Sequence, residues 1–325
     1  MFVNIDNTFF IKKKINQKKL QECTTFISNQ KNIKNLAIEE AYKNNISKII
    51  TLPNSINDED VDIIIKTQFN KDYKFINLDK FEIFYEVNEK IQFAINKFEK
   101  LELNKIKFFP PTHISDDLVF QKLAKGSYYR PNNLDEFNPN LLNNISEVIK
   151  ILSSLKNNEA KVADCLDCFE TSYIKEPLNS KIINIFILML KNNKNETYRT
   201  SLTHGDFKFE HLFNLDEKLE YVVDWENVNV RSIFFDLLNF FVPWFVHRSF
   251  NYSEIKNYIH KFIQFHHPYF LDHISKKYDL YFSIFALERY MRINSARSVE
   301  FNLDEAYKRY NFIFNKLTDG LNIEY

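Results

Sequence analysis

The stretch SLTHGDFKFEHLFNLDEKLEYVVDWENVNV, residues 201–230, places two aspartates in closely similar settings. Asp206 follows His-Gly at the end of a short apolar run, and Asp224 follows a run of aromatic and β-branched residues. An aromatic residue comes directly after each aspartate. The repetition needs an explanation, because the two carboxylates lie far apart along the chain.

The residues between the two aspartates have the pattern of a β-hairpin. Two strand-like segments flank Asp-Glu-Lys at 216–218, which is typical of a turn. A hairpin brings its two ends together, so we predict that Asp206, His211 and Asp224 face one cleft.

Two carboxylates and a third ligand in one cleft suit phosphoryl transfer. That reaction needs a carboxylate near the acceptor hydroxyl, which orients the hydroxyl and accepts its proton. It also needs oxygen or nitrogen ligands that hold Mg²⁺ against the phosphates of the nucleotide. Asp206 would be the base. His211, five residues later, and Asp224 would be the metal ligands.

The overall composition is that of a globular protein without a charge bias. The 325 residues contain 43 Lys and Arg and 43 Asp and Glu, so the formal net charge is zero. This balance argues against a generally basic nucleic-acid binder. Only three glycines occur, at 126, 205 and 320, which excludes a GxGxxG or Walker phosphate loop. A bound nucleotide must therefore be held in another way.

Cysteine usage and hydropathy predict a cytoplasmic protein. The three cysteines, Cys23, Cys165 and Cys168, are too few and too unevenly spaced for a disulfide scaffold, and a reducing compartment fits them. The lone Cys-x-x-Cys has no second ligand pair, so we expect no zinc site there. The start of the chain does not resemble a signal peptide, and the apolar runs are too short to span a bilayer.

Segments before the central stretch predict an alternation of strands and helices. Apolar residues at helical spacing predict one helix over 78–101, with Asp79 as its N-cap. Apolar and β-branched runs predict strands within 60–69, 105–109 and 117–123.

The remainder of the chain is predicted to be mostly helical around a small β insert. This asymmetry predicts an α+β chain with two lobes joined near Gly126. We expect residues 1–50 to form an N-terminal extension or the start of the N-lobe. Residues 51–124 are expected to form the nucleotide-binding N-lobe, and residues 125–325 the C-lobe with the catalytic loop, the metal site and the acceptor pocket.

Three segments, HGDFKFEHLF, YVVDWE and FFDLLNFF, together resemble the aminoglycoside phosphotransferase and choline kinase family, which shares the protein-kinase fold. The family pattern is HGDxxxxN, a hydrophobic strand that runs into Asp-Trp/Phe-Glu, and a downstream Asp-Leu in a helix. The resemblance covers roughly residues 115–245. The positions that match are His204, Gly205, Asp206, Asp224, Trp225, Glu226, Asp236 and Leu237. Within this family, the three segments look most like the variant found in bacterial surface-polysaccharide clusters.

The resemblance implies a two-lobed protein-kinase-like fold, ATP and Mg²⁺ as cofactors, and a role for each matching residue. Asp206 would be the catalytic base, and Lys208 would face the transferred phosphate. Asp224 would be the main Mg²⁺ ligand. His204 would support the catalytic loop, and Asp236 would brace the backbone of that loop from a helix.

Nucleotide contacts are implied in the N-lobe. DLVFQKLAKG resembles the strand and hinge that hold adenine, which places Gln121 and Leu123 near the base. The lysine that binds the α and β phosphates should end a strand before a helix that carries its glutamate partner. We assign it to Lys66, with Glu86 or Glu89 as the partner. An alternative uses one of the lysines at 12–14.

The chain departs from the family pattern in two places. His211 replaces the metal-binding asparagine, and because imidazole prefers softer metals than Mg²⁺, Mn²⁺ or Zn²⁺ is an alternative. The predicted phosphate-covering loop, residues 51–60, contains no glycine. These departures leave a second hypothesis, a catalytically impaired pseudokinase that binds nucleotide or acts as a scaffold. A protein-serine kinase is a third, which the missing APE-like segment disfavours.

The acceptor is predicted to be a small molecule with a hydroxyl group: a sugar, an amino alcohol or an aminoglycoside-like polyol. The resemblance implies an acceptor pocket built from the C-terminal helices, with Glu288, Arg289 and Arg292 as candidate lining residues. The oligomeric state is left open.

Overall fold

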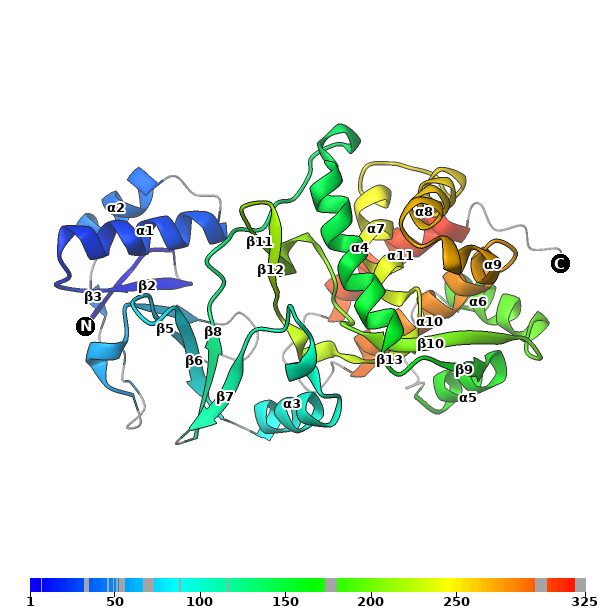
Figure 1. The fold of residues 1–325 in the computed structure, drawn as a ribbon, viewed down its shortest axis with the longest axis horizontal. Coiled ribbons are helices and arrows are strands. Elements are labelled where there is room, and N and C mark those ends of the chain that lie inside the picture. The colour runs from blue at the N-terminus through cyan, green and yellow to red at the C-terminus, as the bar shows by residue number, and fades with distance from the viewer. Residues whose placement is uncertain are drawn as a thin grey trace. The chain divides into compact units, whose positions relative to one another are not determined.

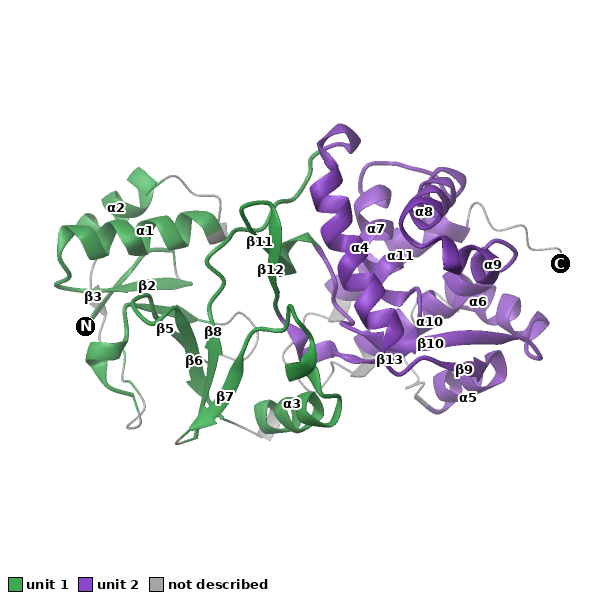
Figure 2. Cartoon of the chain, in the orientation of Figure 1, with its two compact units in different colours: residues 1–132, 209–223 green, residues 133–208, 224–325 purple. Residues whose placement is uncertain are grey.

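The computed structural model describes most of the chain and divides it into two compact units (Figure 2). The first unit contains residues 1–132 and 209–223, and the second contains residues 133–208 and 224–325. The described residues are 1–6, 8–31, 35–45, 47–48, 50, 52, 56–66, 73–87, 89–115, 117–172, 180–295 and 303–318.

An antiparallel sheet forms the body of the first unit, and its strand order is β3-β1-β2-β4-β5-β6-β8-β7. Residues 1–50, which the sequence left open between an extension and the start of a lobe, contribute three of these strands. The strands are β1 (Phe2–Asn4), β2 (Phe9–Lys12), β3 (Ser47–Lys48), β4 (Ile63–Lys66), β5 (Tyr73–Asn77), β6 (Glu82–Glu86), β7 (Thr112–Ser115) and β8 (Leu118–Lys122).

Successive residues of each strand point to opposite faces, so the sheet separates two apolar clusters. Ile63 and Ile76 pack on one face, against buried residues of α1 (Gln17–Lys31) and α2 (Asn35–Asn44). Ile64 lies on the other face with its own cluster. Figure 1 shows α1 and α2 together on one side of the sheet. Because both faces of the sheet are covered by apolar side chains, successive residues of a strand can all be apolar, as Ile-Ile-Ile is in β4.

The prediction of one helix over 78–101 is wrong in its first half. Residues 82–86 form β6, which pairs with both β5 and β8, and only Glu89–Lys100 is helical, as α3. β6 pairs with β8 along its whole length and with β5 over residues 82–84, and these hydrogen-bonded pairings outweigh the helical spacing of its apolar residues. Asp79 is therefore no helix cap, and its carboxylate lies 2.7 Å from Lys19 Nζ instead.

The predicted strand at 105–109 is also wrong. A 3-10 turn, Leu103–Lys105, occupies its start, and the strand in this region is β7, which begins after Pro110-Pro111. Prolines cannot donate to a sheet ladder, so they precede the strand instead of closing it. The strand predicted within 117–123 is confirmed as β8.

The predicted hairpin is confirmed and belongs to the first unit. Its strands are β11 (Leu212–Leu215) and β12 (Lys218–Val222), and Asp216 and Glu217 between them both have positive φ, as tight hairpin turns require. A reciprocal pair of backbone hydrogen bonds joins Asn214 to Ser127. At the neighbouring Gly126, an added Cβ would lie 2.0 Å from the Asn214 carbonyl oxygen, so this close approach requires glycine.

The second unit is mostly helical and carries a small sheet of order β13-β10-β9. The α+β fold class is therefore confirmed. Almost every residue of α7 is buried, and Figure 1 shows this helix among the other helices of the unit. The strands are β9 (Asn158–Lys161), β10 (Thr197–Thr203) and β13 (Asn229–Ser232). The helices are α4 (Pro139–Ser154), α5 (Val162–Ser172), α6 (Ser180–Asn192), α7 (Phe235–Val246), α8 (Tyr252–His266), α9 (Leu271–Ile274), α10 (Tyr278–Ser295) and α11 (Leu303–Thr318).

Across the part of the chain that the structure describes, no helix combines the length and the apolar character that a membrane crossing requires.

Candidate active site

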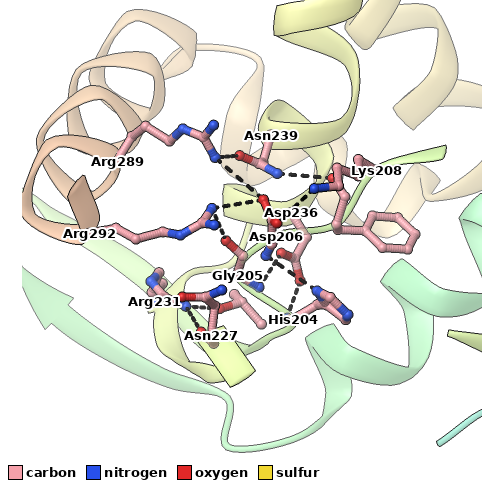
Figure 3. A network of polar contacts seen from close by, with 12 residues as sticks. His204, Gly205, Asp206, Lys208, Asn227, Arg231, Asp236, Asn239, Arg289 and Arg292 are labelled. Atoms are coloured by element: carbon pink, nitrogen blue, oxygen red, sulfur yellow. Dashed lines mark hydrogen bonds and ion pairs between the residues drawn. The ribbon is translucent and has the colours of Figure 1, made fainter. Parts of the chain in front are cut away.

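The loop that carries Asp206 follows β10 and is held by the first turn of α7. The carboxylate of Asp236 accepts the N–H of His204 at 2.6 Å and the N–H of Gly205 at 2.9 Å (Figure 3). This bidentate contact confirms the prediction that Asp236 braces the loop backbone. Asp236 itself is buried, so the loop is attached to the core of the unit.

Gly205 adopts a backbone conformation that other residues rarely accept. Its φ is +83°, and an added Cβ would lie 2.2 Å from the Asn227 carbonyl oxygen. Both the left-handed backbone and the close approach therefore require glycine at this position. The sharp turn at Gly205 directs the next residue, Asp206, away from the direction of β10.

His204 supports the loop from inside the unit, as the sequence predicted. The side chain is completely buried, and its ring lies 4.6 Å from the ring of Trp225 between centroids. Nδ1 of His204 accepts the N–H of Asp206 at 3.3 Å. The histidine and the tryptophan of the two sequence motifs are thus in direct contact.

Asn239, one turn after Asp236 on α7, holds the other end of the loop. Its Nδ2 donates to the Phe207 carbonyl oxygen at 2.9 Å, and its Oδ1 accepts from Arg289. The sequence reasoning missed this residue. The spacing in FFDLLN was the available signal, because positions i and i+3 lie on the same face of a helix.

Replacing Asp236 with asparagine is expected to lower the free energy of unfolding by about 1–3 kcal/mol. The amide nitrogen cannot accept, so one of the two loop N–H groups would lose its partner in a buried place. Burial raises the pKa of Asp236, although His204 and the loop N–H groups oppose the shift, so the neutral amide avoids part of the cost of burying the charge and offsets some of this loss. Chemical denaturation measures the change. An exposed substitution in the same unit, Asp272→Asn on α9, is the control and should leave stability within 0.5 kcal/mol, roughly the spread of neutral surface changes.

Three cationic side chains surround the Asp206 carboxylate. Lys208 Nζ lies 3.0 Å from Oδ2, Arg292 Nη1 lies 3.0 Å from Oδ1, and Arg289 Nη1 lies 4.0 Å from Oδ1. Both arginines come from α10, far along the sequence (Figure 3). The structure thus brings together Asp206, Lys208 and two of the residues considered for the acceptor pocket.

Glu288, the third residue considered for that pocket, has a different environment. Its Oε1 accepts the N–H of Ser232 at 2.8 Å, and Oε2 has no hydrogen-bond partner among the described residues. The side chain is buried. Burial raises the pKa of Glu288 to about 7, although the Ser232 N–H and Arg231 oppose the shift.

Glu288 is expected to make folding stability decrease with rising pH. Its pKa in the folded protein lies above the ordinary 4.5, so the stabilisation is complete below pH 4.5 and is lost as the pH rises to about 7. Glu288→Gln keeps the acceptor for Ser232 and cannot ionise. Between pH 5 and 8 its melting temperature should therefore decrease less than that of the wild type. Parallel decreases in both proteins would show that Glu288 does not carry this pH dependence.

Asp224 lies at the end of the returning strand in a left-handed backbone conformation, with φ 67° and ψ 55°. Its side chain is exposed, and one of its carboxylate oxygens lies within 4.8 Å of a carboxylate oxygen of Asp206. The two aspartates therefore meet, as the hairpin predicted. Two carboxylates at this separation fit a hard divalent cation such as Mg²⁺, whose preferred ligands are oxygens.

His211 belongs to the first unit, in the 3-10 turn Phe209–His211 that leads into β11. Its side chain is buried, and its carbonyl oxygen accepts the N–H of Val223 at 3.0 Å. Val223 immediately precedes Asp224 in the chain. The role of His211 as a metal ligand stays a prediction.

Solved structures of aminoglycoside phosphotransferases have a similar architecture. Aminoglycoside phosphotransferase APH(4)-Ia has a TM-score of 0.51 and 10% sequence identity, with 80% of this chain and 94% of that chain covered. This chain has the fold of the aminoglycoside phosphotransferases. A candidate aminoglycoside phosphotransferase from Ralstonia eutropha JMP134 gives a TM-score of 0.50 at 9% identity, over 79% of this chain and 92% of its own. No protein-family model and no curated protein sequence matches the chain.

Within this phosphotransferase fold, the strand-to-helix connection assumed for Lys66 is wrong. Lys66 ends β4 with an exposed side chain, and the next described element is β5, not a helix. The strand before α3 is β6, residues 82–86, whose sequence EIFYE contains no lysine. Whether Lys66 contacts the nucleotide stays a prediction. Glu86 ends β6 and is exposed, and Glu89 begins α3 but its side chain lies outside the described part.

The other predicted nucleotide residues lie on β8 and directly after it. Gln121 is on β8, and its Nε2 donates to Thr112 Oγ1 at 3.1 Å. Leu123 follows β8, donates its N–H to the Phe81 carbonyl oxygen at 2.9 Å, and packs on the α1–α2 face. The candidate phosphate loop, 51–60, falls partly outside the described residues, and within it Asn57 caps a 3-10 turn.

Proposed function

We propose that this protein is an ATP-dependent phosphotransferase that moves the γ-phosphate of ATP to a hydroxyl group of a small molecule. The observation that carries the proposal is the pair of Asp206 and Asp224, whose carboxylate oxygens lie within 4.8 Å of each other. Asp206 is held on a loop whose backbone is braced at three points from α7. A fixed base beside a second carboxylate is what phosphoryl transfer requires.

In the proposed reaction, the acceptor oxygen forms a bond to the γ-phosphorus while the bond from that phosphorus to the bridging oxygen of ADP breaks. Asp206 orients the acceptor hydroxyl and takes its proton. Lys208, 3.0 Å from Asp206, is close enough to stabilise charge on the transferred phosphoryl group. ADP leaves, and the acceptor carries the new phosphate ester.

We assign the divalent cation to Asp224, with His211 as a further ligand. Bound Mg²⁺, or Mn²⁺ as the alternative, would neutralise charge on the phosphates. We assign nucleotide contacts to Lys66, Glu89, Gln121 and Leu123. We also propose a cytoplasmic location. ATP is supplied there, and a reducing compartment fits the described cysteines, which are all free.

A solved relative supports a small-molecule acceptor. A thermostable mutant of APH(4)-Ia was crystallised in a ternary complex with AMP-PNP and hygromycin B, and it resembles this chain with a TM-score of 0.51 at 10% identity. The broad acceptor class is therefore a hydroxyl compound: a sugar, an amino alcohol or another polyol.

The proposal is tested by measuring ADP release from ATP over a panel of such acceptors. Each reaction is run with Mg²⁺, with Mn²⁺ and with EDTA. Release that depends on both acceptor and metal is the expected result. If Mg-ATP raises the melting temperature but no acceptor is phosphorylated, the protein binds nucleotide without transferring phosphate. If neither effect is seen, the proposal is wrong.

A further inference from the structure

Cationic side chains outnumber carboxylates in the immediate surroundings of Asp206. Among the residues labelled in Figure 3, four are cationic, namely Lys208, Arg231, Arg289 and Arg292, and two are acidic, namely Asp206 and Asp236. Asp236 is engaged with the loop backbone, which leaves Asp206 as the main counter-charge for the cations that reach it. Arg231 has the buried Glu288 as a nearby carboxylate, so the excess of cations lies at Asp206 itself. Lys208, Arg289 and Arg292 lie within 4.0 Å of Asp206, and Asp224 is the one further carboxylate that meets it.

Arg289 and Arg292 lie one turn apart on α10 and reach Asp206 from the same side. Arg292 also donates to the Gly205 carbonyl oxygen at 2.6 Å, and Arg289 donates to Asn239. Only 25% of the Arg289 side chain and 19% of the Arg292 side chain are exposed. Contacts with the loop and α7 therefore hold both guanidinium groups in place.

Arg289 has donors to spare. An arginine offers five N–H donors, and among the described residues Arg289 makes its polar contacts through Nη1. Its Nε and Nη2 are left for a ligand. A guanidinium group matches the geometry of a carboxylate or a phosphate, because it can donate two parallel hydrogen bonds to either group.

Holding these cations together is unfavourable without another anion. Burial, together with the nearby Arg292 and Arg231, lowers the pKa of Arg289 to about 10, and only Asp206 opposes this shift. A bound oxyanion would relieve this repulsion and would gain charge-assisted hydrogen bonds.

We propose that Arg289 and Arg292 bind an oxyanion of the acceptor, so that the substrate is a hydroxyl compound with a carboxylate or phosphate close to the reacting hydroxyl. The inference rests on the proposed phosphotransfer and narrows its acceptor class. Both guanidinium groups lie within 4.0 Å of Asp206, so the anionic group would be bound next to the hydroxyl that Asp206 orients. Amino alcohols and cationic aminoglycosides would be repelled from the same place.

Acceptors built on one carbon skeleton test this inference by kinetics. Glycerol, glycerate and glycerol 3-phosphate differ only in the presence and type of anion, and choline supplies a cationic alcohol. We expect the KM for one or both anionic compounds to be about tenfold or more below that for glycerol, as one or two charge-assisted hydrogen bonds imply. The more strongly preferred compound shows whether the anion is a carboxylate or a phosphate. Equal or better use of glycerol or choline would overturn the inference.

The variant Arg289→Gln tests whether this arginine binds the acceptor or the nucleotide. It should raise the KM for the anionic acceptor about tenfold and abolish the preference over glycerol, with the KM for ATP changed less than twofold. A rise in the KM for ATP instead would show that the arginine serves the transferred phosphate, and the inference would fail. Arg309→Gln is the matched control, because Arg309 is an exposed arginine on α11 that pairs with Glu305.

A binding measurement without turnover distinguishes the inference from the proposed function. Inorganic phosphate should raise the melting temperature of the wild type and of Arg309→Gln, and this shift should be smaller in Arg289→Gln. Phosphate binding that depends on Arg289, in a protein that transfers no phosphate, would support the anion site and reject the kinase. Turnover of neutral acceptors without Arg289-dependent phosphate binding would reject the anion site alone.

Discussion

Replacing Asp206 with asparagine is expected to reduce phosphotransfer about a thousandfold, which is the usual contribution of a general base. Asparagine keeps the size of the side chain but cannot accept the proton of the acceptor hydroxyl. The affinity for ATP should stay the same or increase, because Lys208, which is assigned to the transferred phosphate, loses a counter-charge that competes with it. Release of ADP measures the rate, and calorimetric titration with Mg-ATP measures the affinity.

The control for this substitution is Asp272→Asn, an exposed aspartate in the same unit that should keep the rate of the wild type. The melting temperature of Asp206→Asn must also be recorded, so that a loss of rate is not confused with a loss of fold. If Asp206→Asn transfers phosphate as fast as the wild type, Asp206 is not the base.

Replacing Asp224 with asparagine is expected to remove most of the metal-dependent binding of ATP. Asparagine accepts the left-handed backbone of this position as readily as aspartate does, so the substitution removes the charge and leaves the loop in place. A metal contributes several kcal/mol to the stabilisation of the transferred phosphate, so turnover should fall by about a hundredfold or more. Titration of ATP with and without Mg²⁺ measures the change.

A second substitution at the same position distinguishes the effect of the lost charge from the effect of the left-handed backbone conformation. Asp224→Ala should lose the metal to the same extent and should also unfold more easily, by about 1 kcal/mol, because alanine tolerates a φ of 67° less well. Unchanged Mg²⁺ dependence in Asp224→Asn would mean that another residue holds the metal.

Local features of the site were predictable because they depend on short segments. The turn at 216–218 and the flanking strands predicted the hairpin, and the hairpin predicted that Asp206 and Asp224 would meet. Asp236 could be assigned because its spacing after Asp224 follows a known pattern. The hairpin follows from the backbone geometry of a few residues, whereas the role of Asp236 was implied by the resemblance to a family pattern.

Features that depend on distant pairing were not predictable in the same way. Residues 82–86 have an apolar spacing that suits a helix, and only β5 and β8 on either side make them a strand. The same error led to the choice of Lys66. With residues 82–86 taken as helix, β4 became the strand expected directly before that helix, a place that β6 occupies. Arg289 and Arg292 were candidates for the acceptor pocket, but the sequence did not predict that they contact Asp206. Their contact with Asp206 depends on how α10 packs in the second unit.

Each of the two units is built from two separate segments of the chain, which limits how the gene can recombine and how the protein can be divided into fragments. The chain leaves the first unit after residue 132, returns to it at 209 and leaves again at 224. A fragment that ends at 132 would lack β11 and β12, and with them the Asn214 partner of the backbone at Ser127. A single recombination point therefore cannot exchange one unit for a foreign one. Since the hairpin also lies between Asp206 and Asp224, the two carboxylates and the segment that separates them are expected to pass between genes only as one block.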